Sequence, residues 1–167
     1  MKKNLAPIFF VAIMFLYGCA SAPKFYEGID GKFEVMDRNE YCSKANGVRD
    51  NGVQCLFVSA NNKNKDMAFG LAQKYAVAAV LLRGVSGTHS STQNPLIPSI
   101  KQAEKSKWIQ AFFDNGEHLK YLDQAQIIPE EVFKIKGGYR VGIEARVNYQ
   151  RLNRMLLDEG IIKAITF

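Results

Sequence analysis

A glycine pair in the last third of the chain constrains the fold more than any other feature. Gly137-Gly138 separates two runs of β-forming residues, Val132–Lys136 and Tyr139–Val147. Two-residue hairpin turns need positive φ, which glycine adopts at little cost, so the pair predicts a tight antiparallel hairpin. From Tyr139 to Val147 the second run has an apolar residue at every second position. The charged residues Arg140, Glu144 and Arg146 stand between them. This period of two predicts a sheet with one dry face and one wet face.

Two further strands and a long helix are expected before this hairpin. Lys32–Met36 is a short strand candidate, and Val53–Ala60 is a stronger one, rich in β-branched and aromatic residues. A helix is predicted over Lys65–Arg83, with a cap from the preceding asparagines and an end at Gly84. Apolar residues recur along it at helical spacing and predict its buried face: Met67, Leu71, Tyr75, Ala78 and Leu82.

Two more helices complete the expected elements. Ser99 and Gln102 form a Ser-x-x-Gln capping box at the start of one helix, which would end at Asn115-Gly116. Its predicted buried side comprises Ala103, Trp108, Ile109, Phe112 and Phe113. Asn148 would cap a last helix, closed by Gly160, that buries Leu152, Met155 and Leu156. The apolar tail Ile161–Phe167 is expected to form an edge strand.

This order of elements predicts the fold class. Strand, strand, helix, helix, hairpin and helix in succession favour an α+β fold, a small antiparallel sheet with two to three helices packed on one face. The sequence contains no internal repeat, low-complexity stretch or long linker. We therefore expect a single domain over residues 31–167.

The one long irregular stretch, residues 84–98, is a candidate partner-binding site. Loops longer than about 12–15 residues without structure of their own are uncommon in compact domains and are often functional. A polar stretch from Thr88 to Asn94, which includes Gln93, is followed by Leu96 and Ile97 between two prolines, and these two residues could serve as an apolar anchor. The alternative is that Leu96 and Ile97 fold back onto the core and pin the loop.

The N-terminus has the pattern of an export signal. Two lysines precede an uncharged apolar run of 13 residues, Leu5–Tyr17. A membrane-spanning helix needs about 20 apolar residues, so the run suits a signal peptide better than a membrane span. The boundary Leu16-Tyr17-Gly18-Cys19 resembles the lipobox of bacterial lipoproteins. That resemblance implies cleavage of residues 1–18 and a diacylglycerol and an acylated amine on Cys19. The alternative is an ordinary signal peptide with an incidental cysteine.

Residues 19–30 then form a short tether between the lipid and the domain. No acidic residue stands beside Cys19, and no acidic cluster follows it closely. By resemblance to lipoproteins of bacteria with two membranes, this implies the outer membrane with the domain facing the periplasm. Several acyl chains on one residue give lasting attachment, so the lipid bilayer is an expected partner.

The two remaining cysteines predict a disulfide. Cys42 and Cys55 are an even pair in an exported chain, and the turn signals Asn46-Gly47 and Asp50-Asn51-Gly52 lie between them. A bridge of this loop size would stabilise the fold by about 3 kcal/mol. The alternative is two buried thiols that never pair. Peptide mapping without reductant should recover the linked peptides from protein made in the periplasm, whereas complete alkylation of both thiols would contradict the bridge.

Composition and motifs favour a protein without catalytic activity, metal or cofactor. The formal charge of +6 includes Lys2 and Lys3, which leave with the signal, and the other basic residues are scattered, so no nucleic-acid partner is expected.

Gly84–Thr88 lacks the last glycine of a nucleophile elbow. His89 and His118 have no metal-ligand spacing and are expected at the surface, and Glu130-Glu131 would point to opposite faces of a strand.

The mature domain resembles the small α+β domain of flagellar outer-membrane lipoproteins and of curli-secretion-type lipoproteins. The resemblance rests on a strand followed by an alanine-rich helix (Val53–Ala60, then Met67–Leu82) and on the strand YRVGIEARV at 139–147 before a short helix. It implies a non-enzymatic accessory or interaction module with a protein partner in an envelope assembly or secretion complex. The alternative function is a periplasmic binding protein for a small ligand, peptide or glycan.

Overall fold

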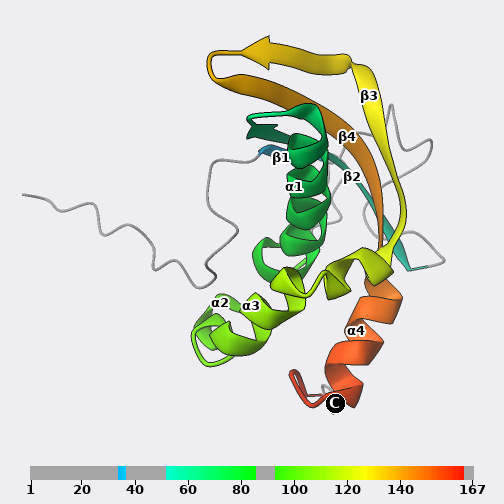
Figure 1. The fold of residues 1–167 in the computed structure, drawn as a ribbon. Coiled ribbons are helices and arrows are strands. Elements are labelled where there is room, and N and C mark those ends of the chain that lie inside the picture. Colours follow the sequence, from blue (N-terminus) through cyan, green and yellow to red (C-terminus); the bar gives the residue numbers. More distant parts are fainter. Residues whose placement is uncertain (1–33, 37–51, 86–92, 164–167) are drawn as a thin grey trace, which may run out of the picture.

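The protein has an α+β fold, as the order of elements predicts. The computed structural model describes residues 34–36, 52–85 and 93–163 (Figure 1). Four antiparallel strands form one sheet in the order β1-β2-β4-β3. Their bounds are Glu34–Met36 for β1, Val53–Asn62 for β2, Leu122–Ile135 for β3 and Gly138–Asn148 for β4. None of the helices in the described ranges combines the length and apolar character needed to cross a membrane.

The hairpin is confirmed, but its turn lies one residue earlier than predicted: Lys136 and Gly137 are the turn residues, and Gly138 is the first residue of β4. Gly137 has φ of 90°, and Ile135 pairs with Gly138 across the turn. A Cβ on Gly138 would lie 2.1 Å from the Asn62 carbonyl oxygen, so glycine is required there by close backbone approach as well. β3 begins at Leu122, earlier than predicted. Its first half holds few β-branched residues, so the sequence does not predict a strand there, and pairing with β4 orders it.

The long helix has its predicted span and most of its predicted buried face. α1 (Lys65–Ala78) continues into the π-helical turn η1 (Ala79–Arg83) and ends at Gly84, whose φ is 79°. The Asn64 side chain caps α1 by accepting a hydrogen bond from the Met67 N–H at 2.8 Å. Met67 is 54% exposed, so its predicted burial is wrong. Tyr75, Ala78 and Leu82 are buried as predicted. Small residues complete the buried face and let the helix backbone approach the sheet closely, including Ala68, Ala72, Ala76 and Ala79.

The second expected helix is broken in two. α2 (Ser99–Gln102) and α3 (Ser106–Asp114) are separated at Ala103, which is exposed rather than buried. The predicted capping box is also wrong, because Pro98 occupies the N-cap and no side chain caps this helix. The Gln102 side chain is buried and donates to the Leu82 carbonyl at 2.6 Å and to the Ile97 carbonyl at 3.0 Å.

The last helix follows the prediction more closely. α4 (Tyr149–Asp158) is capped by Asn148, whose side chain accepts from the Arg151 N–H at 3.0 Å, and Gly160 ends it with φ of 67°. Leu152 and Leu156 are fully buried. Residues 161–163 are not in a strand, and the remainder of the predicted edge strand, 164–167, lies outside the described residues.

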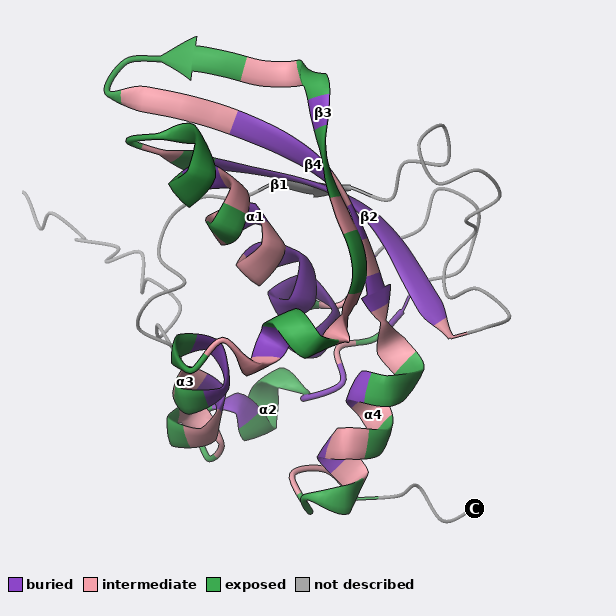
Figure 2. Cartoon of the chain, turned by 45° about the vertical axis from the view of Figure 1, so that its right-hand side comes forward, coloured by how far each residue is buried: buried purple, intermediate pink, exposed green. Residues whose placement is uncertain are grey.

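The main core lies between the sheet and α1, with η1, α3 and α4 closing one end (Figure 2). On β4, Val141, Ile143, Ala145 and Val147 are fully buried and face α1, which confirms the dry face. The opposite face is wet at β4, where Arg140, Glu144 and Arg146 are half-buried, but not at β2. Val53, Cys55 and Phe57 alternate with the residues that face α1 and are also buried, so β2 is covered on both faces.

Candidate functional site

The predicted partner-binding loop is tied to the core. Leu96 and Ile97 are buried within the main core, and Gln93 is buried beside it. The interpretation of Leu96 and Ile97 as an exposed anchor is therefore wrong, and the alternative that they pin the loop is correct. Thr88 lies outside the described residues.

Backbone hydrogen bonds explain why the segment folds back. A helix end leaves carbonyl groups without intrahelical partners, and the returning segment supplies donors for them. The Ile97 N–H donates to the Leu81 carbonyl at 2.8 Å, and the Leu96 N–H donates to the Val80 carbonyl at 3.3 Å. Val85 and Gln93 exchange two bonds of 2.9 and 2.8 Å at the base of the loop. The apolar residues between the prolines thus complete the end of η1.

The cysteine predictions fall largely outside the described residues. Cys55 is buried in β2. Cys42, its expected partner, and Cys19, the expected lipidation site, both lie in ranges that the structure does not describe. The disulfide and the lipid anchor therefore stay predictions.

His118 is buried, which corrects its expected place at the surface. It lies in the 3-10 turn η2 (Glu117–Tyr121), and its ring packs 5.3 Å from the ring of Phe113 and 6.5 Å from that of Phe112, measured between centroids. Burial, and then the charge of Lys74, lower the pKa of His118, so its ring is neutral at neutral pH. Among the described residues no group of three or more His, Cys, Asp or Glu side chains is placed to hold a metal ion.

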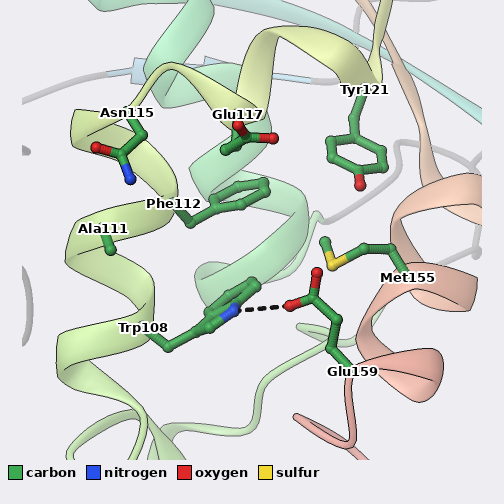
Figure 3. Close-up of a pocket in the computed structure, with 8 residues that line it drawn as sticks. All are labelled: Trp108, Ala111, Phe112, Asn115, Glu117, Tyr121, Met155 and Glu159. Atoms are coloured by element: carbon green, nitrogen blue, oxygen red, sulfur yellow. Dashed lines mark hydrogen bonds between the residues drawn. The ribbon is translucent and has the colours of Figure 1, made fainter.

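A groove with aromatic and acidic walls lies where α3 and η2 face α4 (Figure 3). One stripe of α3 lines it with Trp108, Ala111, Phe112 and Asn115, which are spaced three and four residues apart and so share a helix face. Met155 and Glu159, at the end of α4, form the opposite wall. Glu117 and Tyr121 of η2 close the groove at its upper side in Figure 3. Its volume is about 180 Å³.

The walls are held in position by ring stacking and one side-chain hydrogen bond. Trp108 and Phe112 stack with 5.0 Å between their centroids and 16° between their planes. Tyr121 lies 5.8 Å from Phe112. The Trp108 indole N–H donates to Glu159 Oε2 at 2.9 Å, which joins α3 to the end of α4 (Figure 3). The groove is therefore a preorganised feature that depends on residues 51 positions apart in the sequence.

The charged residues that line the groove are acidic. Glu117 and Glu159 contribute two carboxylates to its lining, and no basic side chain lines it. Burial, and then the charge of Glu159, raise the pKa of Tyr121, as expected for a phenol beside an acidic group. Two basic side chains contact this lining: Lys120 pairs with Glu117, and Arg151, 3.9 Å from Asp123, has its guanidinium carbon 6.0 Å from the centroid of the Tyr121 ring. The charge of the lining therefore depends mainly on Glu159.

Sequence reasoning did not identify this groove. The sequence predicts Trp108, Phe112 and Met155 as core residues. It assigns no functional role to Glu117, Tyr121 and Glu159. The spacing of Trp108, Ala111, Phe112 and Asn115 marks them as one helix face, but periodicity does not say whether a face meets the core or borders a groove.

Comparison of the chain with protein-family models, with curated proteins and with solved structures finds no match.

Proposed function

We propose that this chain is a lipoprotein anchored to the outer membrane through acylated Cys19 and facing the periplasm, where it acts as a non-enzymatic interaction module of an envelope assembly or secretion complex. The Leu-Tyr-Gly-Cys boundary supports the anchor. The interaction role rests on the surface of β3, the strand at the outer side of the sheet.

β3 gathers exposed apolar side chains. Six large apolar residues are exposed in the described part of the chain: Met67, Ile100, Leu119, Ile127, Phe133 and Ile135. Three of them, Ile127, Phe133 and Ile135, belong to β3 and are 43%, 47% and 37% exposed. Isolated exposed apolar residues are normal, and Ile127 pairs with Ile143, so it lies on the face of the sheet toward α1. The contact therefore rests on Phe133 and Ile135, which lie together on the other face. Phe133 pairs with Arg140 and so shares the face of the sheet that is turned away from α1.

A protein is the partner that this strand fits best. Among the described strands β3 pairs with β4 alone, so its other edge offers backbone groups that an extended peptide can pair with. The register shift between Ile127 and Val132, which includes Pro129, interrupts that edge in the middle. Bulges and prolines of this kind limit uncontrolled pairing of edge strands. We therefore place the contact on the Val132–Ile135 half, where Phe133 and Ile135 supply the apolar contact.

Photo-crosslinking in living cells tests this function. A photoreactive phenylalanine at position 133 should give one discrete adduct with a protein of the cell envelope, and the same probe at Ile100 in α2 should not. With the probe at Ile135, Phe133→Ser should reduce the adduct at least about tenfold, which corresponds to about 1.4 kcal/mol. Circular dichroism of the purified variant controls for folding. Equal adducts from positions 100 and 133, or no effect of Phe133→Ser, would contradict a specific contact at β3.

Ligand binding is a second candidate function, and the groove between α3 and α4 favours it. Binding sites for small ligands are concave, mostly apolar and marked by a few placed polar groups. Three aromatic rings, one methionine and two carboxylates meet these requirements on a small scale.

A further inference from the structure

The lining of the groove selects for one class of ligand. The faces of aromatic rings carry negative potential, and Trp108, Phe112 and Tyr121 all line the groove. Aromatic cages of this composition attract organic cations, most strongly when tryptophan takes part. Anionic ligands are disfavoured, since the lining has two carboxylates and no basic side chain.

The charge of Glu159 separates a cation from a neutral sugar. Phe112 stacks on one face of the Trp108 ring, so a ligand of either kind is limited to the opposite face, and Glu159 Oε2 accepts the indole N–H. The Glu159 charge remains at the edge of the groove, beside the rings (Figure 3). Asn115 and Tyr121 offer donors that either ligand could use, whereas the Glu159 carboxylate favours a cation over a neutral molecule.

The size of the groove limits how much of a ligand can enter. A volume of about 180 Å³ is below the roughly 300–1,000 Å³ of pockets for drug-sized ligands. A substituted ammonium group fits such a space.

We propose that the groove formed by Trp108, Phe112, Tyr121, Met155 and Glu159 binds the ammonium group of an organic cation. This site gives a ligand class to the second candidate function and is separate from the β3 contact. The cation has two possible sources, a small quaternary ammonium compound or the side chain of a lysine on another protein. Both present the same chemistry to the rings and to Glu159.

The chain's single tryptophan makes the site directly observable, because no other tryptophan contributes to the fluorescence of Trp108. Mature full-length protein in detergent micelles is titrated with choline and with its neutral isostere 3,3-dimethylbutanol, at constant ionic strength. Choline should change the Trp108 fluorescence in a saturable way, with the isostere binding at least about tenfold more weakly. A parallel titration uses Nα-acetyl-lysine amide, which keeps the charged side-chain amine. Tighter binding of choline indicates a quaternary ammonium ligand, and tighter binding of the lysine derivative indicates a protein side chain.

Substitutions locate the binding. Glu159→Gln removes the charge but keeps an oxygen that can accept the Trp108 N–H, and it should weaken binding of the preferred cation at least about tenfold. Glu144→Gln on β4 removes the same charge on another surface and should leave binding unchanged. Asn115→Asp adds a carboxylate to the lining and should strengthen binding, which keeps the test decisive even if Glu159→Gln unfolds. Phe133→Ser should have no effect, so loss of the β3 contact and loss of the cation site are distinguishable.

Three results would overturn the proposal. The first is the absence of a saturable change with either cation. The second is equal binding of choline and its neutral isostere, which would show that charge plays no part. The third is unchanged cation binding in both Glu159→Gln and Asn115→Asp, which would place the binding outside the groove.

Discussion

Replacing Phe57 with alanine is expected to lower the free energy of unfolding by about 3–5 kcal/mol. Phe57 is 1% exposed and lies on the face of β2 that is turned away from α1. Its ring packs over Gly142 of β4: a Cβ at that glycine would lie 3.0 Å from Phe57 Cε2. Removing the ring therefore leaves a cavity that neighbouring backbone cannot readily fill. Equilibrium unfolding of the purified protein in urea measures the change.

Phe133→Ala is the matched control. It removes the same ring from the same sheet, but Phe133 is 47% exposed on the outermost strand β3. Its cost should be no more than about 0.5–1 kcal/mol. Similar losses for the two variants would contradict burial of the second face of β2. A small loss at Phe133 would also show that effects of this residue on partner capture do not come from unfolding.

Cys19→Ala is expected to eliminate the cleaved, membrane-attached form of the protein almost completely. If Cys19 carries the acyl chains, its substitution eliminates both the lipid and the cleavage site that the Leu16-Tyr17-Gly18-Cys19 boundary defines. The expected products are uncleaved precursor and soluble periplasmic chain. Membrane fractionation, with intact-mass analysis of the wild type for a diacylglyceryl adduct, measures this outcome.

Cys42→Ser is the control for loss of a cysteine as such, because Cys42 lies outside the lipobox. It should leave membrane attachment unchanged, although we expect it to lower stability. A wild-type chain whose mature N-terminus is unmodified and begins at another residue would refute the lipid anchor. A cleaved Cys19→Ala chain that is still attached to the membrane would do the same.

The sequence by itself determined the elements whose causes are local. Gly137-Gly138 set the hairpin because the turn needs positive φ at Gly137 and the backbone approaches closely at Gly138. Asn64 and Asn148 set helix starts because a short polar side chain caps its own helix, and Gly84 and Gly160 set helix ends for the same kind of local reason. Alternation along β4 likewise predicted which of its residues face α1. From these the α+β class followed.

Only the tertiary structure determined which apolar and polar groups contact one another. Leu96 and Ile97 became core residues because the end of η1 needed donors for its carbonyl groups. His118 is buried because Phe112 and Phe113 of α3 pack against it. The groove exists because Trp108 meets Glu159, a contact between distant residues that no local pattern specifies. Periodicity tells which residues share a face, but burial depends on what that face meets, and this is a property of the packed chain.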